Sequence, residues 1–169
     1  MFKYIYRDML SMIRFLPYGV FVGIPVAAIC MFVMKRKGRK EPAATLPVLF
    51  FGFYLALILV ITVFSREGGE SNGVDLELFS TWGINDRNNA FVVENVLLFL
   101  PYGFFGGWVL GKKRRFIICT AMGAITSLCI ECLQLVTGRG FFQIDDILTN
   151  ILGTMIGYLS FKLLFGRRA

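Results

Sequence analysis

Five apolar windows dominate the sequence, and each is long enough to cross the hydrocarbon core of a bilayer, which needs about 20 residues. They cover residues 15–34, 46–64, 91–110, 116–136 and 145–165. Pro and Gly fall inside them, and none alternates between polar and apolar residues as a barrel strand does, so each is predicted to be a helix. The chain is therefore predicted to be one all-α domain over residues 1–169, a polytopic helical bundle in a membrane.

The composition supports a membrane environment. Hydrophobic residues make up 56% of the 169 residues and charged residues 17%, whereas soluble domains have about 45–50% apolar and about 25% charged residues. The first window runs into the basic stretch KRKGRK without a small-residue cleavage site, so we expect a retained anchor rather than a secretory signal. The segment before it, residues 1–14, is amphipathic, which leaves spanning, re-entrant and interfacial arrangements of the N-terminus open.

The charged residues separate into basic and acidic segments. Most of the 18 Lys and Arg residues lie in residues 35–40, in residues 112–115 and in the tail, while residues 65–90 are acidic. The positive-inside rule places the basic segments in the cytoplasm, which predicts a cytoplasmic C-terminus and an N-terminus outside. Because the basic segments sit at membrane boundaries, their expected partners are membrane lipids with anionic headgroups rather than nucleic acid.

A short sequence occurs twice. FLPYGVFVG at residues 15–23 recurs as FLPYGFFGG at residues 99–107, with seven of nine positions identical. Each copy leads into a basic segment and then into another apolar window, which suggests a parallel repeat of two helices. Chance similarity between segments of similar composition is the alternative. Polar residues are concentrated in the second half, so a site is expected chiefly in the last three windows.

Polar side chains fall in each of these last three windows. They are Glu94 and Asn95 in the third window, Ser127, Glu131 and Gln134 in the fourth, and Asp145, Asp146 and Asn150 in the fifth. The three in the fourth window share one helical face, and Asp146 and Asn150 share one face of the fifth with Gly153 and Gly157. Counted along the helical rise, they fall in the outer third of the bilayer, at the level where Arg66 and Arg139 end their windows. Structural positions are expected at Pro101, Gly103, Gly153 and Gly157, since glycines let helix backbones approach closely.

An ionisable group inside a bilayer costs about 2.5–3.5 kcal/mol on insertion scales. Glu94 and Glu131 are therefore predicted to face the interior of the bundle. Two interpretations follow: the polar residues form a pocket open toward the outer leaflet, or they hold helices together through ion pairs and amide hydrogen bonds. Their number favours the pocket.

The residue types restrict the chemistry. The chain has no histidine, which excludes Ser-His-Asp triads and most zinc sites. The carboxylates could hold a divalent cation, but no spaced acidic motif requires it, so no metal or cofactor is predicted. The catalytic residues stay unknown, and an enzymatic interpretation would use Glu131 or Asp146 as acid/base or metal ligand. The CIEC sequence lies in the middle of a window, where its cysteines are expected to be packing residues.

Three segments, ENVLLFLPYGFF, SLCIECLQLVTGRG and IDDILTNILGTMIGY, together with FSR at residues 64–66, resemble the VanZ-like family of bacterial membrane proteins. The resemblance covers roughly residues 60–160. The family's characteristic positions correspond to Arg66, Asn95, Pro101, Gly103, Ser127, Glu131, Gln134, Arg139, Asp146, Asn150 and Gly153. Gln143 departs from it, because an acidic residue is more usual there.

The resemblance implies a protein of the bacterial plasma membrane and, for some members, low-level resistance to teicoplanin, a lipidated glycopeptide. The leading hypothesis is a pocket that binds an amphiphile, either the lipoglycopeptide or a lipid-linked cell-wall precursor. The alternatives are an enzyme acting on such a precursor and a structural or interaction protein. Neither the ligand nor the oligomeric state follows from the sequence.

Overall fold

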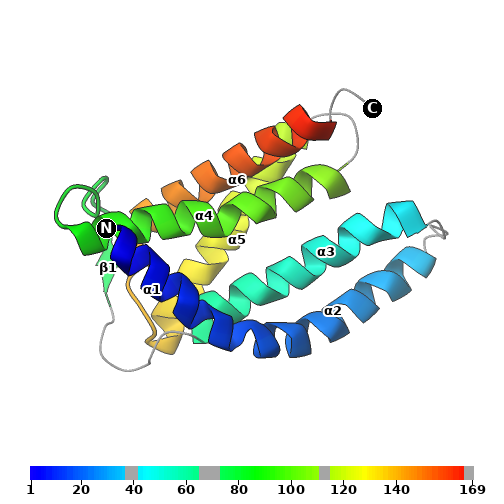
Figure 1. Cartoon of the computed structure of the whole chain (residues 1–169), viewed down its shortest axis with the longest axis horizontal. Coiled ribbons are helices and arrows are strands. Elements are labelled where there is room, and N and C mark those ends of the chain that lie inside the picture. The colour runs from blue at the N-terminus through cyan, green and yellow to red at the C-terminus, as the bar shows by residue number, and fades with distance from the viewer. Residues whose placement is uncertain (37–41, 65–72, 111–114, 166–169) are drawn as a thin grey trace.

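The computed structural model describes residues 1–36, 42–64, 73–110 and 115–165 as a helical bundle (Figure 1). The elements are α1 (Phe2–Met12), η1 (Ile13–Phe15), α2 (Leu16–Arg36), α3 (Pro42–Leu59), η2 (Val60–Phe64), β1 (Val74–Asp75), α4 (Asp86–Val109), α5 (Arg115–Thr137), β2 (Phe142–Gln143) and α6 (Ile144–Phe165). Five helical segments of the described chain are long and apolar enough to cross a membrane. The prediction of an all-α membrane bundle is confirmed.

The first candidate span is longer than the apolar window predicted from sequence. It runs from Phe2 to Val33 through α1, η1 and α2, instead of beginning at residue 15. The change of direction falls at η1, immediately before Pro17. Proline has no N–H to donate and its ring clashes with the carbonyl four residues earlier, so a helix bends at this point.

The amphipathic helix α1 turns its apolar face outward. Phe2 is 80% exposed, and Tyr6, Met9 and Leu10 are also exposed, whereas Ile5 is buried. Ile5 therefore does not share the outer apolar face of this segment. Large apolar side chains on the outer surface are favourable beside lipid, so α1 is suited to contact acyl chains or the membrane interface.

Helices α4 and α6 lie side by side along the bundle (Figure 1). Their contact is made where Gly103, Gly153 and Gly157 face the backbone of the other helix. A Cβ atom at Gly157 would lie 1.9 Å from the carbonyl oxygen of Leu100, and the other two would lie 2.0 and 2.3 Å from a facing carbonyl oxygen. Only glycine allows backbones to approach this closely.

The two FLPYG copies differ in their surroundings. The first lies at the junction of η1 and α2, and the second lies inside α4. Gly19 of the first copy faces Leu57 of α3, whereas its counterpart Gly103 faces α6. Equivalent glycines therefore support packing against different partners, and a repeat of whole helix pairs stays a prediction.

Pro101 lies inside α4, where a proline interrupts the hydrogen bonding of the helix. One turn earlier, the Tyr54 hydroxyl donates to the carbonyl oxygen of Leu98 at 2.6 Å. Beside this contact, Ile58, Phe99, Tyr102 and Ile130 form a buried apolar cluster. A hydroxyl from α3 thus contacts the α4 backbone one residue after Leu97, whose carbonyl loses its helical donor to the proline.

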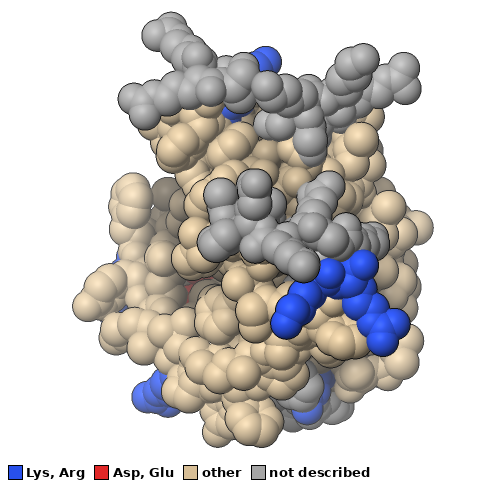
Figure 2. Space-filling view, turned by 90° about the vertical axis from the view of Figure 1, so that its right-hand side faces the viewer, with Lys and Arg blue, Asp and Glu red and all other residues tan. Residues whose placement is uncertain are grey.

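The two ends of the bundle differ in charge and structure. The short strands β1 and β2 pair in parallel near the N-terminus, with Val74 opposite Phe142. The C-terminal end of α6 lies at the opposite end (Figure 1). That end carries Lys35, Arg36 and Lys162, and the view onto it shows Lys and Arg with almost no Asp or Glu (Figure 2).

The glycine contact gives a direct prediction. The Gly157→Ala substitution should lower the free energy of unfolding by about 1–3 kcal/mol or more, which is the usual cost of overpacking. The facing carbonyl belongs to a helix backbone and cannot rotate away from the added methyl group. Thermal unfolding in detergent measures this. Gly106→Ala is the matched control, since its Cβ would meet the Cys119 side chain at 2.8 Å and not a backbone. Equal stability of the two variants would contradict the close contact.

Candidate functional site

A cavity of about 520 Å³ lies near the β1 end of the bundle, between α1, η2, the first half of α4 and the segment that follows α5. We call it the polar cavity. It is lined by Asp8, Ser11, Met12, Ile61, Thr62, Arg87, Phe91, Glu94, Asn95, Leu98, Arg139, Gly140, Phe141, Gln143 and Asp146. Charged groups of both signs therefore share one cavity with apolar and aromatic side chains.

The residues proposed from sequence divide between the polar cavity and its surroundings. Glu94, Asn95, Arg139 and Asp146 line it. The buried side chains of Ser127, Glu131, Gln134, Asp145 and Asn150 lie behind the lining. Arg66 lies outside the described residues. The residues proposed from sequence thus form two groups, one that lines the cavity and one that is buried without lining it, and their common depth in a membrane stays a prediction.

Helix α5 supplies most of the second group. Glu131 accepts a hydrogen bond from the backbone N–H of Gln143 at 2.9 Å, which fixes β2 against α5. The Ser127 hydroxyl accepts from the Asn150 side chain of α6, also at 2.9 Å. These contacts join α5 to β2 and α6 in the way the structural interpretation describes.

The end of η2 is stabilised by two side chains. Gln134 donates to the carbonyl oxygen of Thr62, and Arg139 donates to that of Val63, both at 3.0 Å. The last carbonyls of a helical segment have no partner within it. Arg139 therefore has two roles in the geometry, since it lines the polar cavity and satisfies a backbone group.

Asp145 and Asp146 are consecutive but point to different surroundings. Asp145 accepts hydrogen bonds from the backbone N–H groups of Phe79, at 2.7 Å, and Thr81, at 2.9 Å. Phe79 has a positive φ of 61°, which a non-glycine residue adopts only when its surroundings hold it there. Asp146 lines the polar cavity. Asp145 thus positions the segment before α4, and both carboxylates also suit the N-terminus of α6.

The same loop contains a second carboxylate with a structural role. Asp75 accepts from the backbone N–H of Glu77 at 3.0 Å and from the Ser80 hydroxyl at 2.9 Å. The backbone hydrogen bond, followed by the hydroxyl, holds the pKa of Asp75 below its usual value. Asp75 is therefore kept ionised as the partner of two loop donors.

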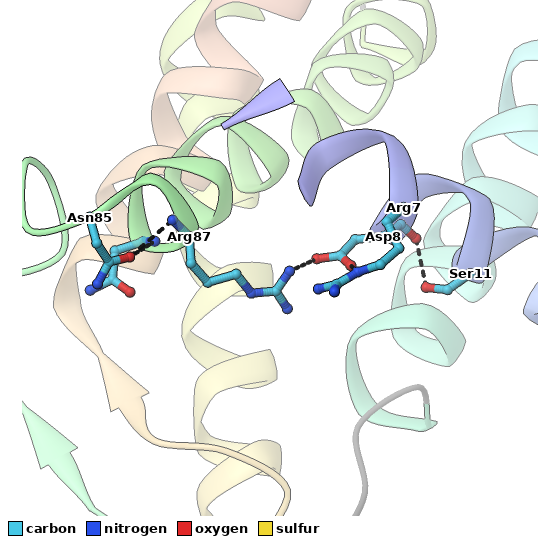
Figure 3. Close-up of polar contacts among 6 residues, drawn as sticks. Arg7, Asp8, Ser11, Asn85 and Arg87 are labelled. Carbon is cyan, nitrogen blue, oxygen red and sulfur yellow. Dashed lines mark hydrogen bonds and ion pairs between the residues drawn. The ribbon is translucent and has the colours of Figure 1, made fainter. Parts of the chain in front are cut away.

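The structure adds α1 to the site, which the sequence did not predict. Arg87, near the N-terminus of α4, forms an ion pair with Asp8 of α1 (Figure 3). Its guanidinium also lies 4.4 Å from the ring centroid of Phe91 and 5.5 Å from that of Tyr4. The signal in the sequence was Asp8, the only acidic residue in an otherwise basic N-terminal segment.

Helix α4 begins earlier than the predicted window because of a cap. Asn85 accepts hydrogen bonds from the backbone N–H groups of Arg87 and Asn88, each at 2.9 Å (Figure 3). This is the standard N-cap arrangement. It extends α4 by a turn beyond its apolar part and places Arg87 within reach of α1.

Within the described residues, no group of three or more His, Cys, Asp or Glu side chains is placed to hold a metal ion.

The fold and the site define a multi-pass helical membrane protein with a polar cavity near one end of its bundle. The chain belongs to the VanZ/LLP1 family, whose family model matches residues 50–165. The comparisons with curated proteins and with solved structures gave no match. The resemblance read from the sequence motifs is thereby confirmed.

The contrast between Asp145 and Asp146 can be tested. Asp145→Ala should expose the amides of Phe79 and Thr81 to faster hydrogen exchange, because each loses its acceptor at a local cost of about 1–3 kcal/mol. Exchange measured by mass spectrometry on the peptide spanning residues 73–85 reports this. Asp146→Ala is the control and should leave that peptide protected. Equal protection in all three proteins would show that Asp145 does not hold the loop.

Proposed function

We propose that this VanZ-type membrane protein binds an amphiphilic or lipid-linked molecule of the bacterial envelope in the polar cavity. Through this binding it would contribute to low-level resistance to teicoplanin-type glycopeptides. The observation that carries the proposal is the cavity itself, which joins charged residues of α1 and α4 to an apolar wall. Its volume of about 520 Å³ is in the range of small-ligand sites, about 300–1,000 Å³.

The two kinds of lining suit the two parts of an amphiphile. Asp8, Arg87 and Glu94 provide charge, while Met12 and Leu98 provide apolar surface. A charged or hydroxylated headgroup gains hydrogen bonds at the first set, and an acyl chain loses water contact along the second. A purely polar solute would leave the apolar wall uncovered.

The proposal places the polar cavity at the outer face of the plasma membrane. The support is charge: Lys35, Arg36 and Lys162 lie at the end of the bundle opposite β1, and basic residues favour the cytoplasmic side. The N-terminus would then be outside. In this orientation the cavity faces the leaflet in which a lipoglycopeptide or an exported cell-wall precursor is found.

Filling the polar cavity should remove the protection. Ser11→Phe places an aromatic ring at the lining, and Asn95→Ala removes a polar group from it. In a teicoplanin-susceptible Gram-positive host, we expect both variants to return the minimum inhibitory concentration to that of cells lacking the protein. Membrane insertion of each variant is checked by blotting of the membrane fraction.

The controls are neighbours that face outward. Leu10→Phe changes the exposed face of α1, and Leu97→Ala changes an exposed position beside Asn95. Both should protect like the wild type. Full protection by Ser11→Phe and Asn95→Ala would contradict the cavity proposal. Equal loss of protection in all four variants would show that the substitutions impair folding and not ligand binding.

A further inference from the structure

Charged residues of both signs line the polar cavity. Among its described lining residues are three carboxylates, Asp8, Glu94 and Asp146, and two guanidinium groups, Arg87 and Arg139. Arg87 is already engaged, since it pairs with Asp8 and lies against two aromatic rings. Arg139 already donates to a backbone carbonyl. Both guanidinium groups among the described lining residues therefore already have partners within the protein.

Glu94 is the carboxylate that this arrangement leaves unsatisfied. Its Oε1 atom is buried and has no hydrogen-bond partner within the part of the chain that the structure describes. The charged groups that act on Glu94 are Asp8, Arg87 and Arg7, and both arginines are already paired with Asp8. A buried acceptor without a donor is costly and uncommon in folded proteins. A ligand that brings donors would remove that cost.

We propose that the polar cavity selects amphiphiles that carry an ammonium group, with Glu94 receiving it. An ammonium has three donors and a positive charge, which matches a carboxylate oxygen that lacks a donor. Asn95, the next residue along α4, also lines the cavity and adds an amide oxygen as a further acceptor. The inference rests on the proposed function, because it names the headgroup class of the ligand for the same cavity.

The ligand's chain has a separate path. Met12 and Leu98 line the cavity beside the charged groups, and the outer face of α1 is apolar and exposed. An alkyl chain leaving the headgroup site along these residues stays out of water. The site therefore recognises the charge of the headgroup on one wall and accepts a chain on the other, with no need for a defined chain structure.

Native mass spectrometry of the full-length protein, released from uncharged dodecyl maltoside micelles, tests this selectivity. The probes are tetradecylamine, tetradecanol and tetradecanoate, which share a chain length and differ in headgroup charge. We expect the amine to bind about tenfold more tightly than the other two, the scale of one charge-assisted hydrogen bond. The net charge of the chain is +7, so nonspecific attraction would favour the carboxylate instead.

Glu94→Gln keeps the size of the side chain and removes its charge, so it should reduce the preference for the amine to less than about twofold. Glu77→Gln, an exposed change in the loop, is the control and should retain it. If Glu94→Gln does not fold, Ser11→Phe decides, because filling the cavity must abolish the preference. A wild-type protein without headgroup preference, or a folded Glu94→Gln variant that keeps it, overturns the proposal.

The outcome also separates this inference from the proposed function. Equal binding of all three probes, abolished by Ser11→Phe, would leave a cavity for amphiphiles and remove only the ammonium preference. Binding of every probe that is insensitive to Ser11→Phe would contradict both. Preference for the amine that depends on Glu94 and on an unfilled cavity supports both.

Discussion

The close approach of α4 and α6 is the contact on which the arrangement of the polar groups depends. Three glycines allow the backbones to touch, which fixes how far each helix is rotated and shifted relative to the other. With that contact in place, Glu94 and Asn95 on α4 and Asp146 on α6 line one cavity. A side chain at any of the glycines would separate the helices and draw these groups apart.

Polar residues inside a membrane protein must be satisfied by one another, since no water is available in the hydrocarbon region. Here that requirement produces two layers. Behind the polar cavity, Glu131 and Asp145 accept from backbone N–H groups, and the side-chain N–H of Asn150 donates to Ser127 while its Oδ1 has no partner among the described residues. At the lining, Glu94 keeps an oxygen without a partner among the described residues. The structural interpretation and the pocket interpretation therefore describe different residues of the same cluster.

Much of the fold was predictable because it follows from the length and spacing of apolar and polar residues along the chain. Apolar length gives the spans, and helical spacing gives the faces that carry Ser127, Glu131 and Gln134. Partners were not predictable in this way. Asp145 and Asp146 differ by about 100° around the helix, so neighbouring carboxylates meet different surroundings. Ligand binding by the residues that line the cavity stays a prediction.

The pair between Asp8 and Arg87 could not be found from periodicity either, because the residues are 79 positions apart. Helix α1 presents a polar side to the cavity and an apolar side outward, which suits a lipid surface. Two ion pairs join this N-terminal segment to α4: Asp8 with Arg87, and the N-terminal ammonium with Asp86. The family match begins at residue 50. One wall of the cavity is thus built from sequence outside the matched region, and its chemistry can change without altering the α4–α6 contact.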